Sequence, residues 1–423
     1  MSSIKQKDFD VVVLGAGVIG VCAAYWIARA GLSVCVIDRE PEAALETSFA
    51  NGGQISVSHA EPWANPDAPL KILKWLFDSE APLLFRPKLD VHQWVWIAQF
   101  LVECLPHRAN RNTTEIVKLA TESRTRLQEI REREGIHYDE RTKGILHFYR
   151  DPVEFESAIR VAELMKKHGC DRRVIDADQV VEIEPAFEDS RMKIVGATYT
   201  AADESGDAKK FTQGLATICE KMGVTFLYDS HVVALDANRE AGVVNAVHVR
   251  TRQGCERIRM GDVIVSLGSY SAPFLRSYGI LLQVYPAKGY SVTIPFNGAN
   301  AAPVTSLTDD QYKIVYSNFG DRLRVAGTAE LSGYSLDLNY ERCNAILKNV
   351  RELFPRAGRF DEAEFWTGLR PATPSNLPYV GRSERYRNLW PNTGHGTLGW
   401  TLAAGSGRRI ADMIKTAEGP IVA

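Results

Sequence analysis

The stretch VVVLGAGVIGVCAAYWIARAGLSVCVID, residues 11–38, decides the fold of this chain. Its apolar residues predict a short strand at 11–14, a helix at 18–30 and a second strand at 34–37. The second strand ends at Asp38. A strand, a glycine-rich turn, a helix and a further strand in this order predict a Rossmann-type unit that binds a dinucleotide.

Three glycines in this turn form the pattern G-x-G-x-x-G. Gly15 permits the tight turn, Gly17 lets backbone N–H groups approach a pyrophosphate, and Gly20 lets the helix pack against the strand. The helix N-terminus adds partial positive charge to the phosphate site. Asp38 lies where a carboxylate accepts hydrogen bonds from the adenosine ribose, which disfavours the 2′-phosphate of NADP. This stretch alone leaves NAD and FAD as alternatives.

The composition limits the remaining possibilities. The 423 residues suffice for two domains, and the net charge of −2 shows no basic footprint for nucleic acid. The seven cysteines form no C-x-x-C pair, which indicates buried thiols in a reducing compartment and no metal site. No uninterrupted apolar stretch reaches membrane-spanning length. We therefore expect a cytoplasmic protein.

Further elements follow the first unit without a repeat or a low-complexity linker. We expect helices at 112–134, 153–168 and 208–222, the first capped by Asn112 or Thr113. We expect strands at 224–227, 232–235, 243–249 and 263–267, the middle two as a hairpin.

This order predicts an α/β protein in which a mixed-sheet, α+β substrate domain interrupts a Rossmann-type domain twice. The cofactor domain is expected at residues 8–60, 196–275 and 362–423. The substrate domain is expected at residues 61–195 and 276–361.

The C-terminal part carries a second informative pattern, WTGLRPATPSNLPYVG (366–381) and NLWPNTGHGTLGWTLAAGSG (388–407). The second stretch predicts a strand, a glycine turn and the start of a helix. Gly394, Gly396 and Gly399 free backbone N–H groups at that helix N-terminus, which suits the negative charge of a reduced flavin. This pattern favours FAD over NAD.

Taken together, these segments resemble the D-amino acid oxidase family of FAD enzymes, and within it the bacterial D-amino acid dehydrogenases. The resemblance spans nearly the whole chain and includes LETSFANGGQIS (45–56), ESGDAKKFTQGLA (204–216) and GLRPATP (368–374). It implies oxidation of a D-amino acid to a 2-oxo acid and ammonia. Hydride would pass from Cα to flavin N5, and the electrons would then reach a quinone or another acceptor that is not oxygen.

The resemblance also implies cofactor contacts. The ADP half would be held by Val13, Gly15, Ala16, Gly17, Val18, Ile19, Gly20, Asp38 and Arg39. The ribityl chain and flavin ring would be lined by Thr47, Ser48, Asn51, Gly52 and Gln54. Val232 would contact the adenine, Gly268 would line the cofactor, and the pyrimidine edge would be covered by Thr393, Gly394, His395, Gly396, Thr397 and Leu398. No cysteine lies near GLRPATP, so we expect FAD to be held non-covalently.

Arg370 matches the arginine that binds the substrate carboxylate in this family. Guanidinium offers a fixed bidentate fork to a planar carboxylate. The alternative is a structural arginine at a strand end. Tyr290 is a weaker candidate for a second carboxylate contact, and Tyr312 and Tyr316 are either pocket walls or core residues.

Two histidines invite functional interpretations. His395 is a candidate general base, but its tight glycine turn favours a backbone contact to flavin with the imidazole filling space. His59 is a candidate for covalent flavin attachment, but a surface or pocket-rim position is the preferred interpretation.

Residues 69–85 (PLKILKWLFDSEAPLLF) combine apolar side chains with Lys71 and Lys74, and a second aromatic run follows at 94–101. One interpretation is packing inside the substrate domain. The other is an interfacial patch that touches the inner face of the bacterial plasma membrane and gives access to quinone.

Several alternatives remain open on the sequence. They are an oxidase that produces hydrogen peroxide, and a dehydrogenase or oxidase of a cyclic or N-methylated amino acid such as D-hydroxyproline or sarcosine. Outside this class are an NAD-linked reductase and a non-catalytic flavin- or NAD-binding protein.

Overall fold

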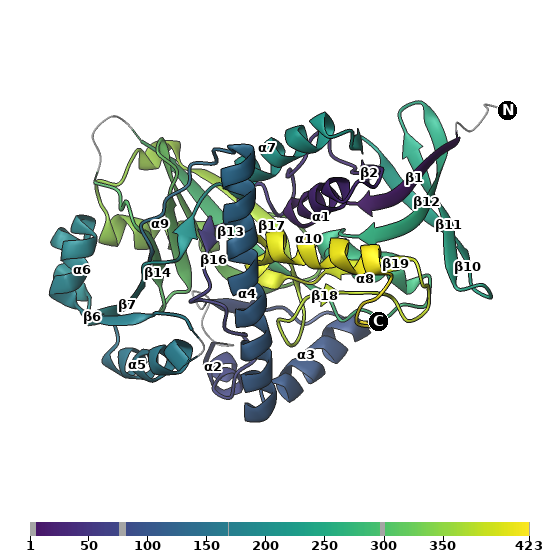
Figure 1. Cartoon of the computed structure of the whole chain (residues 1–423). Helices are drawn as coiled ribbons and strands as arrows, with labels where there is room; N and C mark the ends of the chain where they lie inside the picture. Colours follow the sequence, from purple (N-terminus) through teal and green to yellow (C-terminus); the bar gives the residue numbers. More distant parts are fainter. Residues whose placement is uncertain (1–5, 76–81, 168, 297–300, 423) are drawn as a thin grey trace.

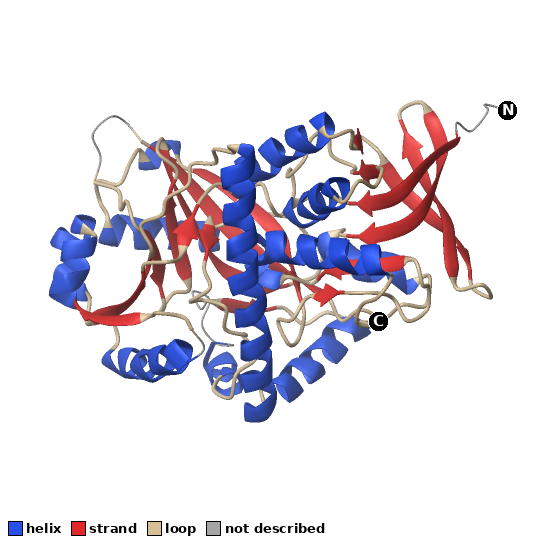
Figure 2. Cartoon of the chain, viewed as in Figure 1, coloured by secondary structure: helices blue, strands red, loops and turns tan. Residues whose placement is uncertain are grey.

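The computed structural model describes residues 6–75, 82–167, 169–296 and 301–422. Two sheets lie side by side in an elongated molecule (Figure 2). Helix α4 (Pro106–Glu134) crosses the middle of the molecule (Figure 1). This arrangement matches the predicted α/β fold with a separate mixed sheet.

The first sheet contains the predicted Rossmann strands. In the described residues its parallel strands run in the order β9-β2-β1-β12-β19. Their bounds are β1 Gln6–Leu14, β2 Val34–Ile37, β9 Thr225–Leu227, β12 Gly254–Val265 and β19 Leu389–Thr393. The antiparallel strands are β10 His231–Asn238, β11 Val243–Thr251 and β18 Tyr379–Val380. The predicted hairpin is confirmed, but the strand expected from residue 263 begins at Gly254.

Both faces of this sheet are covered, as is usual for parallel strands. One face packs against α1 (Val18–Arg29), α7 (Ala208–Lys221), α10 (Gly399–Thr416) and α4. On the other face, the parallel strands share a core with α8 (Ser271–Arg276) and with side chains of the antiparallel strands β10 and β11 of the same sheet. Six of the seven cysteines are buried as predicted, and Cys255 is exposed.

Helix α4 begins earlier than its cap residues predicted. Its first residue is Pro106, where the missing N–H costs no helical hydrogen bond. Asn112 is therefore no cap: it is buried inside the helix, and its side-chain amide donates to Glu103 at 2.8 Å. The helix ends at Gly135, whose φ of +63° is typical of a helix stop.

The other two predicted helices are confirmed with small shifts. Helix α5 spans Pro152–Lys167, and residue 168 lies outside the described residues. Helix α7 ends at Lys221, and Asp207 caps its N-terminus by accepting from the Lys209 and Lys210 N–H groups.

The second sheet is mixed, in the order β17-β13-β16-β15-β14-β5-β7-β6, with β4 beside β16. The bounds are β4 Leu83–Phe85, β5 Ile145–Tyr149, β6 Arg173–Asp176, β7 Gly196–Thr200, β13 Tyr285–Pro295, β14 Ser306–Asp309, β15 Ile314–Asn318, β16 Arg322–Leu331 and β17 Glu364–Ala372. Strand β7 begins the expected cofactor segment 196–275, and strand β17 lies near the start of the expected cofactor segment 362–423. Both strands pair in the second sheet and not in the Rossmann sheet. The domain boundaries themselves remain predictions.

The remaining elements that have not yet been given bounds are α2 Ala68–Trp75, α3 Val91–Glu103, β3 Gln54–Ile55 and β8 Glu204–Ser205.

The two faces of the second sheet have different surroundings. Helices α9 (Tyr340–Leu353) and α6 (Ala177–Ile183), with the 3-10 segment Pro185–Lys193, pack on one face of the second sheet. Side chains alternate along each strand, so neighbours of the core residues Ile314 and Tyr316 point to the opposite face. That face borders a cavity.

Candidate active site

A cavity of about 1240 Å³ lies between the two sheets. The carboxyl ends of four parallel strands lead into its wall, at Gly15 after β1, Asp38 after β2, Ser266 after β12 and Thr393 at the end of β19. In open α/β sheets, ligands bind outside the carboxyl ends of the strands. The cavity therefore occupies the position expected for a dinucleotide.

The predicted glycine turn is closely packed. Gly15 has φ of +104°, and a Cβ there would lie 2.5 Å from the Ser266 carbonyl oxygen. A Cβ at Gly20 would lie 1.9 Å from the Gly15 carbonyl oxygen. Only glycine permits this approach of helix α1 to the turn.

Other glycines leave space on the cavity side. Among described residues, a Cβ at Gly17 would meet only Ser48 Oγ, at 3.6 Å, and a Cβ at Gly268 would meet nothing within 4 Å. At Gly396 the nearest atom would be Asn376 Nδ2 at 3.9 Å. These three glycines line the cavity. Because they have no side chains, the cavity keeps room there for a dinucleotide cofactor.

Asp38 lines the cavity and also organises the turn. Its Oδ2 accepts from the Ala16 N–H at 2.5 Å, and its Oδ1 accepts from the Glu40 N–H at 2.9 Å. Burial raises the pKa of the Asp38 carboxyl, and the two N–H donors oppose that shift. The predicted ribose ligand thus also holds the backbone of the glycine turn.

We expect Asp38→Ala to raise the dissociation constant of FAD about tenfold to 100-fold. The substitution removes hydrogen bonds of a charged group, worth about 1.5–3 kcal/mol. Titration of the apoprotein with FAD, followed by flavin fluorescence, measures the change. Asp412→Ala is the matched control, because it removes an exposed carboxylate that pairs with Arg408 at 2.8 Å on α10. An unchanged dissociation constant would show that Asp38 does not hold the cofactor.

The predicted adenine end contains a fixed cation. Arg39 lies 4.5 Å from the Tyr270 ring centroid and forms an ion pair with Glu46. Val232, the predicted adenine contact, also lines the cavity.

The predicted flavin-side residues Thr47, Ser48, Asn51, Gly52 and Gln54 all line the cavity. Thr47 Oγ1 donates to the backbone of β17 at 3.0 Å, and Ser48 Oγ accepts from the first N–H of α1 at 3.2 Å. The Gln54 side-chain amide donates to three oxygens of β14 at 3.0–3.2 Å. Its side chain therefore builds the wall between the two sheets.

The C-terminal glycine turn joins β19 to α10. His395 is buried, and its Nε2 lies 3.0 Å from Ser406 Oγ. Burial lowers the pKa of His395 to about 3, so the imidazole is neutral at physiological pH. This placement favours the space-filling interpretation over the general base.

Not every predicted cofactor residue reaches the cavity. Thr393, His395, Gly396, Thr397 and Leu398 line it. The residues behind its wall are Val13, Ala16, Gly20 and Gly394.

Arg370 lies on β17 and faces the cavity. Its Nη1 donates to the Thr328 carbonyl oxygen at 2.7 Å, and no carboxylate of the described residues lies within ion-pairing distance. Burial lowers the pKa of Arg370 to about 10, so the guanidinium still carries its charge at neutral pH. A Cβ at Gly289 would lie 2.2 Å from its Cζ. Gly289 thus makes the space in which this unpaired cation sits.

The tyrosine candidates belong mainly to the core. Tyr290 is among the residues that line the cavity, but it packs in the core of the second sheet, and its hydroxyl donates to Glu330 at 2.6 Å. Burial raises the pKa of Tyr290 far above its usual range. Tyr316 is fully buried and Tyr312 packs against the same core, so the core interpretation holds for both.

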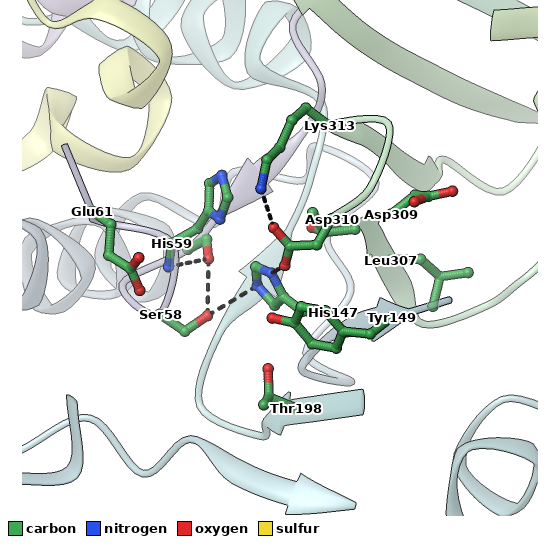
Figure 3. A network of polar contacts seen from close by, with 12 residues as sticks. Ser58, His59, Glu61, His147, Tyr149, Thr198, Leu307, Asp309, Asp310 and Lys313 are labelled. Carbon is green, nitrogen blue, oxygen red and sulfur yellow. Dashed lines mark hydrogen bonds and ion pairs between the residues drawn. The ribbon is translucent and has the colours of Figure 1, made fainter. Parts of the chain in front are cut away.

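A group of polar side chains lines another part of the cavity (Figure 3). This polar cluster consists of His59, Glu61, Tyr149, Arg172, Asp310 and Lys313, with His147 packed behind them. Lys313 forms a 2.5 Å ion pair with Asp310, and Figure 3 shows its ammonium directed at that carboxylate. The His59 ring lies 5.1 Å from the His147 ring. Burial and the neighbouring His147 lower the pKa of His59 to about 4. His59 is therefore a neutral cavity-lining histidine.

A buried arginine forms the base of this cluster. Arg172 pairs with Glu61 at 3.0 Å and donates to the hydroxyls of Tyr149 at 3.0 Å and Thr198 at 2.9 Å. Apart from His59, this cluster was not predicted, because the strands that assemble it are far apart along the chain.

The predicted interfacial segment is partly core. In the described part of 69–85, Ile72, Leu83 and Phe85 pack with Trp96 and Phe100 of α3, and Leu70 is exposed. The side chains of 73–75 and the whole of 76–81 lie outside the described residues. The exposed apolar surface is found on α3 and at its C-terminal end, at Val91, Trp94, Val95, Leu101, Val102 and Leu105. Among the described helices, none combines the length and apolar character needed to cross a bilayer.

Two proteins with similar sequences are each named D-amino acid dehydrogenase. The relative from Dechloromonas aromatica is 52% identical over 404 residues, which is 96% of this chain and 96% of the relative. The relative from Paramagnetospirillum magneticum is 48% identical over 407 residues, which is 96% of this chain and 94% of the relative.

Solved structures show the same fold at low sequence identity. An L-proline dehydrogenase from P. horikoshii matches with a TM-score of 0.74 and 18% identity, covering 98% of this chain and 95% of the other. A glycine oxidase from Bacillus cereus matches with a TM-score of 0.69 and 22% identity, covering 96% and 95%. Residues 10–413 match the family described as FAD dependent oxidoreductase. The cavity, the glycine turns and these matches agree that the chain belongs to the family of FAD-dependent oxidoreductases.

Proposed function

We propose that this chain oxidises D-amino acids to 2-oxo acids and ammonia and passes the electrons to a quinone. The observation that carries the proposal is Arg370, whose guanidinium faces the cavity and has no carboxylate partner in the part of the chain that the structure describes. A guanidinium without a protein carboxylate is suited to bind a ligand carboxylate in two parallel hydrogen bonds. Relatives named D-amino acid dehydrogenase support this substrate class.

Each part of the site has a separate task in this proposal. The two glycine turns and Asp38 would hold FAD, which would supply the hydride acceptor for the substrate Cα. Arg370 fixes the carboxylate, and the Thr328 carbonyl oxygen orients its guanidinium. The neutral, buried His395 is held by Ser406, so we assign the loss of the ammonium proton to water in the cavity.

We propose that FAD is held without a covalent bond. Among the described residues that line the cavity there is no cysteine. The His395 ring is hydrogen-bonded to Ser406, and His59 lies in the polar cluster, where its ring is tilted against that of His147.

Anaerobic mixing of the FAD-loaded protein with amino acids tests the activity. D-amino acids should bleach the flavin absorbance, and the L-enantiomers should leave it unchanged. Readmission of air separates a dehydrogenase from an oxidase, because an oxidase regains its colour rapidly and releases hydrogen peroxide. Bleaching by sarcosine or D-hydroxyproline in preference to primary D-amino acids would replace the substrate proposal. A flavin that no amino acid bleaches would mark a non-catalytic protein.

The exposed face of α3 supports the quinone part of the proposal. Its apolar residues recur at spacings of three and four, which places them along one side of the helix. The opposite side carries Trp96, Ile97 and Phe100, which line the cavity, as do Trp94 and Leu101 of the exposed face. A lipid-soluble acceptor that partitions at this face would therefore be close to the cavity. We propose that this face rests on the inner surface of the bacterial plasma membrane.

We expect Val95→Asp combined with Val102→Asp to reduce cosedimentation with lipid vesicles severalfold. Both residues are exposed on the apolar side of α3 and do not line the cavity. Reduction of a water-soluble dye by a D-amino acid should be unchanged, since neither residue approaches the substrate. Val174→Asp combined with Met192→Asp is the matched control, because these exposed residues lie elsewhere on the substrate domain. Unchanged cosedimentation would remove the membrane from the proposal.

A further inference from the structure

The cavity face of the second sheet presents a row of residues from four neighbouring strands. The side chain of Arg370 on β17 lies over Gly289 on β13, where a Cβ would stand 2.2 Å from its Cζ. Thr328 on β16 and Lys313, the residue before β15, continue along the same face. Strands lie about 4.8 Å apart, so three spacings separate β17 from β15 by about 14 Å across the sheet. The carboxylate clamp and the polar cluster are thus two ends of one row.

Lys313 has hydrogen-bonding capacity left over. Its side chain is 44% exposed, and it lines the cavity, so this exposure is to the cavity interior. One N–H of the ammonium donates to Asp310, and two remain. Its φ of +53° is rare for a residue with a side chain and marks a backbone that the surrounding structure must hold.

Acceptors face the same space. Glu154 on α5 lines the cavity, and its Oε2 is buried without a hydrogen-bond partner among the described residues. Burial raises the pKa of Glu154, and the nearby Lys313 and Lys71 oppose that shift. The ring nitrogens of His59 also have no partner in the described part of the chain, so they can accept or donate.

The charges of this cluster are balanced. Lys313 pairs with Asp310, and Arg172 pairs with Glu61. The further charged residues that line this part of the cavity are Asp67, Lys71, Glu154 and Arg160. These four residues add two cations and two anions, so the charges again cancel. A charged group of a ligand at this end of the cavity would have no opposite charge to balance it, and burying an unbalanced charge costs free energy.

We propose that the polar cluster is the subsite for the end of the substrate side chain, and that it selects D-amino acids ending in a carboxamide. A carboxamide offers two N–H donors to Glu154 and His59 and a carbonyl acceptor to Lys313, and it brings no charge. With its carboxylate at Arg370, a substrate of the length of D-glutamine points its amide along the row. This inference rests on the proposed oxidation of D-amino acids.

Comparison of D-glutamine with D-norleucine tests the subsite, because the two side chains are similar in length and differ in the terminal group. We expect the wild type to show the higher kcat/KM for D-glutamine. In Lys313→Met combined with Asp310→Asn, which removes the ion pair as a unit, the ratio should fall about tenfold to 100-fold. The kcat/KM for D-norleucine should be unchanged. Glu154→Met should also lower the ratio of kcat/KM for D-glutamine to kcat/KM for D-norleucine. This variant leaves the Lys313–Asp310 ion pair in place.

Two unreactive acids give a readout that does not depend on turnover. Glutaramate and hexanoate carry the carboxylate and the two side chains but no amino group, and their binding is followed by perturbation of the flavin spectrum. The wild type should bind glutaramate more tightly, and the Lys313→Met, Asp310→Asn protein should lose that preference. Lys415→Met combined with Asp412→Asn, on the exposed part of α10, is the control. This variant should keep the preference for D-glutamine over D-norleucine and the preference for glutaramate over hexanoate.

Equal losses for both substrates in the variants, with flavin still bound, would overturn the subsite, as would a wild type that prefers D-norleucine. Failure of every D-amino acid to bleach the wild-type flavin would instead overturn the proposed function itself.

Discussion

Arg370→Ala is expected to raise KM for D-amino acids and to lower kcat by on the order of 100-fold, with FAD still bound. The guanidinium is the carboxylate anchor of the proposed site, and a substrate displaced by about 1 Å from its reactive position can lose that much rate. Arg370→Lys keeps a charge but loses the bidentate fork, so its KM should lie between those of the wild type and the alanine variant. Anaerobic flavin reduction at varied substrate concentrations separates the two effects.

Gly289→Ala provides a second route to the same result. The new Cβ would stand 2.2 Å from the Arg370 Cζ and must push the guanidinium out of its place. This variant should resemble Arg370→Lys in KM while retaining the arginine. An amine without a carboxylate should be oxidised poorly by the wild type and equally poorly by all three variants. Wild-type kinetics of Arg370→Ala with D-amino acids would place the carboxylate clamp elsewhere.

Gly20→Ala should yield a folded protein purified without its flavin. The new Cβ would lie 1.9 Å from the Gly15 carbonyl oxygen, so helix α1 or the glycine turn must shift. Overpacking of this kind costs about 3 kcal/mol, which corresponds to about a 100-fold loss of FAD affinity if it falls on the cofactor turn. The flavin-to-protein absorbance ratio after purification measures the loss.

Gly31→Ala is the matched control for Gly20→Ala. Gly31 follows the same helix at its far end, with φ of +87° and no atom within 4 Å of the added Cβ. Its strained backbone should lower the melting temperature, while the flavin content stays at the wild-type level. Equal flavin loss in both variants would mean that Gly20 acts through general stability.

The Rossmann unit was predictable because its signals are local. The glycine spacing, the apolar strands and Asp38 all lie within residues 11–38, and each occupies its expected place. Helix α4 was predicted too short, because Asn112 and Thr113 look like caps although the helix already begins at Pro106. A possible cap inside a longer amphipathic segment does not by itself end the helix.

The candidate site was only partly predictable, for two physical reasons. Alternation along β13 gives the cavity to Gly289, and it turns the side chain of its neighbour Tyr290 into the core. The polar cluster depends on the register of β5, β14 and β15, which brings His147, Asp310 and Lys313 together. Register between strands so far apart in sequence is set by tertiary packing, so single-sequence patterns did not reveal it.

Two adjacent residues connect the cofactor turn to the carboxylate clamp. Ser48 accepts from the Val18 N–H at the start of α1, and Thr47 donates to the carbonyl oxygen of Leu369, the residue before Arg370. These two hydrogen bonds join the glycine turn to the strand that carries the guanidinium. If FAD at the turn strengthened the binding of a carboxylate at Arg370, thermodynamic linkage would require that carboxylate to strengthen the retention of FAD by the same factor.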